Sequence, residues 1–213
     1  MPIVKGFKGI RYSPDKIGDF AKVLAPPYDV ISPAEQETLL ALDPLNVVRL
    51  VLPKGDSDLK YERAAKTFRD WFLGDVLIQD QEPSIYPYYQ EFEIGGKKYT
   101  RKGFIAKVKL EDFSTKKILP HELTFPKHKQ DRLKLNTACK ANMSPVFSVY
   151  SDPEGGVEKA IEENLGEPIF DVTTADGVRN VLWRISDAEL ISQITRDLAH
   201  KSFIIADGPP RYE

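Results

Sequence analysis

The sequence predicts a mixed α/β fold of the α+β kind, because strand-like and helix-like segments alternate along its 213 residues. Apolar residues make up 41% of the chain and charged residues 29%, an ordinary globular composition that can build a packed core. This length allows one large domain or two small ones. The polar stretch 80–83 ends in a proline and is the best boundary, so we expect an N-terminal part over residues 1–84 and a second part over residues 85–213.

The N-terminal part contains a loop made rigid by proline, followed by a helix. Pro26 and Pro27 fix their own backbone angles and restrict the residue before each, which predicts an extended loop. Ser32 can cap the next helix, because a proline follows it and Glu35 stands three residues on. We expect this helix to run from residue 33 to about residue 42.

Two more elements are expected before residue 75. Residues 46–52 are rich in β-branched side chains and lie between two prolines, which predicts a buried strand. A helix should follow Ser57 or Asp58, either of which can cap it, and should end at Gly74. Its apolar residues recur at helical spacing, which predicts a face turned to the core. The members of that face are Tyr61, Ala64, Ala65, Phe68, Trp71 and Phe72.

The second part opens on a predicted β-hairpin. Two aromatic-rich runs, 85–94 and 99–110, flank a Gly95-Gly96 pair that is typical of a tight turn. We expect the aromatic side chains of this hairpin to pack on a core face. Further strands are expected at 145–150, 181–185 and 202–206, and further helices at 157–165 and 186–198.

Charge, cysteine content and hydropathy exclude several classes of protein. The net charge of −2 and the isoelectric point near 6.0 do not supply the positive field of a non-specific nucleic-acid binder, so nucleic acid is not an expected partner. Cys139 is the only cysteine, which excludes an internal disulfide; it could be a nucleophile or, more commonly, a small packing residue on a helix. The sequence shows no signal peptide and no apolar run of about 20 residues, so we expect a cytoplasmic protein without a membrane segment.

The first candidate for chemistry lies near the C-terminal end of the sequence. The predicted strand 202–206 runs into Asp207-Gly208, and Arg211 follows closely. Glycine lets backbone N–H groups approach an anion, and arginine can hold a phosphate through two parallel hydrogen bonds. An Asp-Gly pair after a strand is also common in plain turns, so both interpretations stay open.

The second candidate is the basic stretch 119–132. Glu122 could act as a general base on a hydroxyl group. Three cations of this stretch could hold phosphate charge, namely Lys127, Lys129 and Arg132. His121 and His128 are seven residues apart, which is no familiar zinc spacing, so any metal stays unknown. The alternative is a solvated, charged loop that leads into a helix.

Eight short blocks spread over nearly the whole chain carry a resemblance to a known family. They lie at 9–12, 25–32, 46–50, 101–106, 120–124, 129–132, 144–147 and 205–208. They include the runs Pro26-Pro27-Tyr28, Pro120-His121-Glu122 and Lys129-Gln130-Asp131-Arg132. In order and spacing these blocks resemble a prokaryotic family catalogued as domain-of-unknown-function family 1015. The resemblance implies a ParB/sulfiredoxin-like core over 85–213, with the N-terminal part as an extension.

The resemblance also implies a site. In ParB-like free-serine kinases a His-Glu pair precedes a phosphate loop, and the matching residues here are His121 and Glu122, with Glu122 as the base. Asp207, Gly208 and Arg211 match the loop. A nucleotide-dependent phosphotransfer to a small hydroxyl metabolite such as serine is thereby implied, with ATP or ADP and Mg²⁺. A nucleotide- or phosphate-binding regulatory module without catalysis is the alternative.

Two departures from the family pattern bear on activity. Pro209 and Pro210 stand where the family has two histidines, which removes two backbone N–H donors and two imidazoles from the loop. Family members are also about twice as long, so we expect a chain that is incomplete at its C-terminus and could be an inactive fragment. Apolar edges left uncovered in such a fragment would favour a homo-oligomer.

Overall fold

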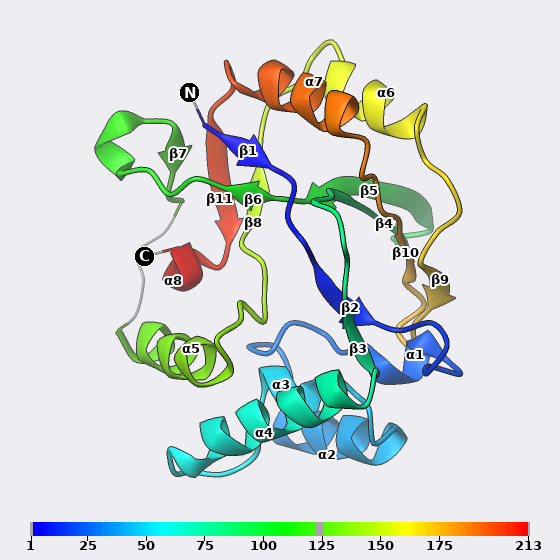
Figure 1. Ribbon diagram of the computed structural model, residues 1–213, viewed down its shortest axis with the longest axis vertical. Helices are drawn as coiled ribbons and strands as arrows, with labels where there is room; N and C mark the ends of the chain where they lie inside the picture. The colour runs from blue at the N-terminus through cyan, green and yellow to red at the C-terminus, as the bar shows by residue number, and fades with distance from the viewer. Residues whose placement is uncertain (1, 122–125, 213) are drawn as a thin grey trace.

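The computed structural model describes residues 2–121 and 126–212, apart from the side chains of residues 126–128 and 210, and it has the expected mixed α/β architecture. Figure 1 shows strands and two helices in the upper half of the view and a group of helices in the lower half. The N-terminal strand lies in the upper half, and the chain then descends to the helices before it returns.

A four-stranded antiparallel sheet forms one side of the upper half, in the order β5-β4-β10-β9. Its strands are β4 (Tyr86–Ile94), β5 (Lys97–Ile105), β9 (Phe170–Thr173) and β10 (Arg179–Leu182). Gly95 and Gly96 join β4 to β5 with φ angles of 58° and 78°. Two positive φ angles in succession are what a type I′ turn requires, so the predicted hairpin is confirmed. Its aromatic residues are only partly in the core, because Tyr86 is buried whereas Tyr99 is exposed.

A three-stranded sheet forms the other side of the upper half. Its middle strand, β11 (Phe203–Asp207), pairs in parallel with β7 (Ile118–Leu119) and antiparallel with β8 (Phe147–Val149). The remaining strands form two ribbons, β1 (Val4–Lys5) with β6 (Lys107–Val108) and β2 (Ile10–Tyr12) with β3 (Leu77–Gln79). A short 3-10 helix, η1 (Phe113–Thr115), precedes β7.

Two helices close the core between these sheets. They are α6 (Gly156–Glu162) and α7 (Ala188–Leu198), and both were expected from the sequence. The Asp187 side chain caps α7 by accepting hydrogen bonds from the N–H groups of Glu189 and Leu190. Ile194 and Leu198 of α7 are fully buried and pack with Ile85. The predicted strands over 145–150, 181–185 and 202–206 are present as β8, β10 and β11, with ends that differ from the prediction by one to three residues.

The lower half is mostly helical, and the β2–β3 ribbon lies beside its helices (Figure 1). The helices are α1 (Phe20–Val23), α2 (Pro33–Leu42), α3 (Val48–Val51), α4 (Leu59–Leu73), α5 (Pro126–Cys139) and α8 (Pro209–Tyr212). The predicted capping of α2 is confirmed, because Ser32 accepts a hydrogen bond from the N–H of Glu35. The helix predicted after residue 58 is α4, and Gly74 ends it by donating to the carbonyl of Asp70. Phe72 of its expected core face is 40% exposed.

The strand predicted over residues 46–52 is wrong, because this stretch contains the short helix α3. Asn46 is buried and explains the difference: its Oδ1 accepts the N–H of Val48, and its amide donates to the carbonyls of Lys22 and Leu24. These bonds turn the backbone into a helical turn and fasten it to α1, so no strand partner is needed. Side chains that compete with strand hydrogen bonds in this way override β propensity.

The division at residues 84 and 85 stays a prediction. The two parts contact each other through β1, which pairs with β6, and through Thr195, which donates to the carbonyl of Val4. Among the described residues, none of the helices combines the length and the apolarity that crossing a bilayer requires.

Candidate functional site

Helix α5 contains the basic residues of the second candidate, and apolar packing fixes its position on α4. Leu135 is fully buried and Cys139 is nearly so, and both pack against Tyr61 and Ala64 of α4. Burial raises the pKa of the Cys139 thiol, which keeps it protonated and unreactive. Cys139 is therefore a packing residue on a helix, and α5 has a defined orientation on α4.

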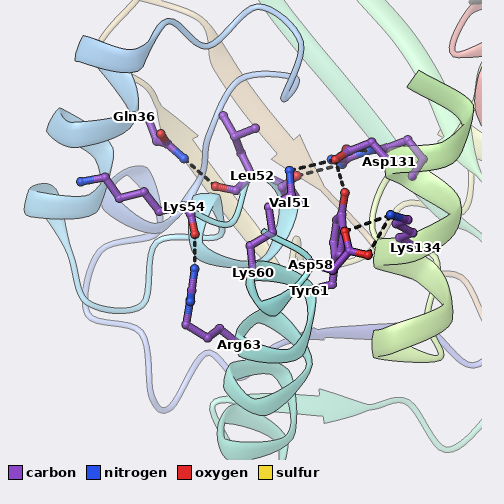
Figure 2. A network of polar contacts seen from close by, with 11 residues as sticks. Gln36, Val51, Leu52, Lys54, Asp58, Lys60, Tyr61, Arg63, Asp131 and Lys134 are labelled. Carbon is purple, nitrogen blue, oxygen red and sulfur yellow. Dashed lines mark hydrogen bonds and ion pairs between the residues drawn. The ribbon is translucent and has the colours of Figure 1, made fainter. Parts of the chain in front are cut away.

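Polar contacts set the register between the two helices (Figure 2). The Tyr61 hydroxyl donates to Oδ1 of Asp131 at 2.6 Å, and Lys60 Nζ lies 3.1 Å from the same oxygen. Asp58 does not cap α4 as expected; its carboxylate pairs with Lys134 of α5 at 2.8 Å. Burial alone would raise the pKa of Asp131, but hydrogen bonds from Tyr61 and its arginine neighbour outweigh burial and lower it to about 2.

Arg132 is held almost completely inside the protein by this arrangement. Its side chain is 4% exposed, its Nη1 donates to the carbonyl of Val51 at 2.8 Å, and its Nε donates to Asp131 at 3.0 Å. The guanidinium carbon lies 3.8 Å from the ring centroid of Tyr28, which is a close cation–π contact. Most of the hydrogen-bonding capacity of Arg132 is therefore committed to the protein itself.

Tyr28 lies in the proline-rich loop, and a second arginine, Arg211, lies in the same region as Arg132. Burial raises the pKa of the Tyr28 phenol, and the positive charges of Arg132 and Arg211 both oppose that rise. Arg132 comes from α5 and Arg211 from α8, and these two helices pack against each other. Arg132 therefore contacts the phenol ring directly, and Arg211, on the helix packed against α5, lies near enough for its charge to act on the phenol.

The Asp207-Gly208-Arg211 segment forms a compact turn at the end of β11. Nη2 of Arg211 donates to Oδ2 of Asp207 at 2.8 Å, and the Arg211 side chain is only 7% exposed. Gly208 has a φ of 82°, and a Cβ built on it would lie 2.1 Å from Nη2 of Arg211. The guanidinium therefore occupies space that any other residue at 208 would fill.

Arg211 has hydrogen-bonding capacity that the described part of the chain does not use. Its Nε is buried without a hydrogen-bond partner, and its guanidinium makes one side-chain hydrogen bond, to Asp207. The other buried side-chain atom without a partner among the described residues is Nε of Arg49, whose Nη2 bonds the carbonyl of Leu40 at the end of α2. An unsatisfied buried donor costs about 1–3 kcal/mol, so an anion that accepted from Arg211 would bind favourably.

The structure brings together four of the predicted site residues, Arg132, Asp207, Gly208 and Arg211. Lys129 is half-buried on α5, and His121 is exposed just after β7. Glu122, the predicted base, lies outside the described residues, as do the side chains of Lys127 and His128. Among the described residues, no three histidine, cysteine, aspartate or glutamate side chains gather in a way that could hold a metal ion.

Sequence reasoning missed two members of the site, Tyr28 and Asp131. Tyr28 and Asp131 both lie in blocks that carry the family resemblance, next to Pro27 and Arg132 respectively. The sequence therefore marked both positions, but it indicated no role for either side chain. Tyr28 contacts Arg132, 104 positions away, and Asp131 contacts Tyr61, 70 positions away, and no local pattern reports such contacts.

Comparison with known proteins gives one match. A family model described as a protein of unknown function (DUF1015) matches residues 4–213, nearly the whole chain. No curated protein and no solved structure gives a significant match. The cytoplasmic location and the ParB/sulfiredoxin-like core stay predictions.

Proposed function

The chain belongs to the DUF1015 family, and from that premise we propose that it binds the phosphate groups of a nucleotide at Arg211 and transfers phosphate to a small hydroxyl metabolite such as serine. The observation that carries the proposal is the buried Nε of Arg211, which has no hydrogen-bond partner among the described residues. A second buried guanidinium, that of Arg132, lies on the neighbouring helix α5. Each of these guanidinium groups has a carboxylate partner, Asp131 or Asp207, and the donor that Arg211 has left over favours an anionic ligand.

The two arginines would have different roles. Arg211 has N–H groups that are not hydrogen-bonded within the described residues, and these would bind phosphate oxygens directly. Arg132 already donates hydrogen bonds to Val51 and Asp131, so it would add positive charge from a fixed position. Asp207 holds Arg211 in place, and Gly208 leaves room for its guanidinium. Arginine suits phosphate because its planar fork matches two oxygens at once.

The chemical step would depend on Glu122. This carboxylate would take the proton from the hydroxyl of the metabolite as that oxygen bonds to the terminal phosphorus and the bond from phosphorus to the rest of the nucleotide breaks. ATP or ADP would supply the phosphate, and Mg²⁺ bound with it would neutralise part of its charge. This assignment of Glu122 rests on the likeness to ParB-like serine kinases.

Binding without turnover is the second candidate function. Pro209 and Pro210 favour it, because they cannot donate the backbone N–H groups that histidines at the same positions would supply. A transition state gains more than a ground state from such donors, so their loss would reduce turnover more than affinity. The chain would then act as a nucleotide-responsive regulatory module.

Calorimetry on the full chain tests the binding site. Wild-type protein should bind ADP, ATP and inorganic pyrophosphate, and Arg211→Gln should weaken each by about tenfold or more. Arg69→Gln is the matched control, because Arg69 is exposed on α4 and has no described ion pair. Equal affinities for wild type and Arg211→Gln would overturn the site.

Turnover separates the two candidate functions. Purified wild type and Glu122→Gln should be incubated with ATP, Mg²⁺ and serine, and phosphoserine should be measured. Product from wild type and a large loss in Glu122→Gln would support phosphotransfer. Tight nucleotide binding without product would favour the regulatory module, and equal turnover by both proteins would end the assignment of Glu122 as the base.

A further inference from the structure

Aromatic and cationic side chains gather on one face of the β4–β5 hairpin, outside the site already described. Phe92 and Tyr99 are cross-strand partners, and their rings stack with centroids 6.0 Å apart. The guanidinium carbon of Arg101 lies 5.4 Å from the ring centroid of Phe92 and 5.5 Å from that of Phe147 in β8. We name these four residues, Phe92, Tyr99, Arg101 and Phe147, the aromatic platform.

The platform is open to solvent but held in place from behind. Tyr99 is 45% exposed and Phe147 is 42% exposed, so ring surface is available to a ligand. Arg101 donates to Oε1 of Gln90, its cross-strand partner, and Gln90 donates in turn to the buried Asn180. A planar group can stack on such a surface without a large ordering cost.

The charge near the platform selects for an anionic ligand. Strand β5 contains four cations, and among the described residues only Lys102 of these four pairs with acidic side chains, those of Glu158 and Glu162 of α6. Lys97 and Arg101 point to the same face as Tyr99, because side chains two residues apart share a face of a strand. Neither has an acidic partner within the described part of the chain.

The platform adjoins the phosphate site through one strand pair. Phe147 is the cross-strand partner of Asp207, the residue that holds Arg211. Paired residues of neighbouring strands have Cα atoms about 5 Å apart. The platform and the phosphate-binding segment are therefore neighbours, although their residues come from three separate stretches of sequence.

We propose that the aromatic platform is the base-binding subsite for the nucleotide whose phosphates bind at Arg211. The proposal rests on the phosphate site of the proposed function and adds the residues that would recognise the base. The base would stack on Phe147 and on the guanidinium of Arg101, and the chain of phosphates would extend past Asp207 to Arg211. Stacking accepts any base, so the subsite would favour nucleotides over inorganic phosphates more than it would separate one base from another.

Calorimetry with two ligands tests the proposal, using the full chain with ATP and with inorganic tripolyphosphate. Wild type should bind ATP more tightly than tripolyphosphate. Phe147→Ala should weaken ATP binding by about 5- to 150-fold, the range of one lost base stack, and leave tripolyphosphate affinity unchanged. Phe147→Tyr should retain ATP affinity, because it keeps a ring. Phe72→Ala is the matched control, since Phe72 is 40% exposed on the distant helix α4.

The outcomes separate this proposal from the one it rests on. If tripolyphosphate binds and Phe147→Ala has wild-type affinity for ATP, the platform is not a base subsite and the phosphate site survives. If neither ligand binds wild type, both proposals fail. Equal losses of ATP and tripolyphosphate affinity in Phe147→Ala would indicate damage to the neighbouring Asp207 segment and would also overturn the stacking role.

Discussion

The guanidinium of Arg132 covers the ring of Tyr28, with 3.8 Å between its central carbon and the ring centroid. This contact fastens the proline-rich loop to α5, across about a hundred residues of sequence. Arg132 is almost completely removed from water and Tyr28 is half-buried, so the interaction is stronger than it would be at an exposed site. The contact also fixes the position of one of the two buried positive charges of the candidate site.

Replacing Tyr28 tests whether that contact positions Arg132. Tyr28→Leu should weaken pyrophosphate binding by several-fold and lower the free energy of unfolding by about 1–2 kcal/mol, because a desolvated cation–π contact is lost. Tyr28→Phe keeps the ring and should bind as wild type does. Titration calorimetry and urea unfolding measure the two effects, and equal behaviour of the leucine and phenylalanine variants would contradict this role of the ring.

Gly208→Ala tests the space that Arg211 occupies. A Cβ at 208 would lie 2.1 Å from Nη2 of Arg211, and the end of that flexible side chain can move away more easily than the backbone can. The variant should therefore stay folded, lose about 1 kcal/mol because alanine is strained at a φ of 82°, and bind pyrophosphate much more weakly. Gly177→Ala is the control, since it has a similar φ of 81° with open space around its Cβ position.

Local sequence patterns were sufficient to predict the elements that are fixed by interactions between residues close together in the sequence. The Ser32 cap of α2 and the Gly95-Gly96 turn each depend on contacts within three residues, and each was predicted correctly. The strand predicted over 46–52 is wrong because Asn46 bonds the end of helix α1, more than twenty residues away. The alternation of helix-like and strand-like segments predicted the fold class, whereas long-range hydrogen bonds decided the structure of residues 46–52.

The candidate site shows the same division. The resemblance pointed to Asp207, Gly208 and Arg211, and the structure joins them with Arg132. Tyr28 was outside the prediction, because nothing near it in sequence indicates that α5 will pack above its ring. The apolar face of α5 is also weak as a pattern, since only a few of its side chains, such as Leu135 and Cys139, are deeply buried.

Asp131→Asn should destabilise the junction of α4 and α5. The folded-state pKa of Asp131 is lowered from 3.8 to about 2, so the ionised carboxylate stabilises the fold by about 2 kcal/mol above pH 4. That contribution should disappear as the pH falls from about 4 to about 2. Urea unfolding at pH 7 and at pH 3 should show a difference between wild type and variant that shrinks at the lower pH. Asp58→Asn is the control: its carboxylate is 74% exposed, so its pair with Lys134 should contribute less than about 1 kcal/mol.

A second buried carboxylate joins the N-terminal ribbon to the four-stranded sheet. Asp80 is 3% exposed and accepts hydrogen bonds from Arg11 at 3.0 Å, from Arg184 at 3.2 Å and from the Tyr86 hydroxyl at 2.7 Å. The Tyr86 oxygen also accepts the N–H of Gly9 at 2.8 Å. The buried carboxylate of Asp80 faces two arginines, and the Tyr86 hydroxyl is satisfied as both donor and acceptor, which makes this cluster a structural junction.

Tyr86→Phe tests how this junction contributes to the free energy of unfolding at alkaline pH. Burial, and then the hydrogen bond to Asp80, raises the pKa of Tyr86 to about 12, so the protonated phenol stabilises the fold below pH 10 and loses that effect as the pH rises to about 12. At pH 8 the variant should be less stable by about 1–3 kcal/mol, because Asp80 loses a donor and Gly9 loses an acceptor. Urea unfolding from pH 8 to pH 11.5 should show this difference shrinking above pH 10. If the difference in free energy of unfolding between wild type and variant stays constant over that range, the stabilising effect of the hydroxyl does not depend on its ionisation. The assigned cause of the pKa shift would then be wrong.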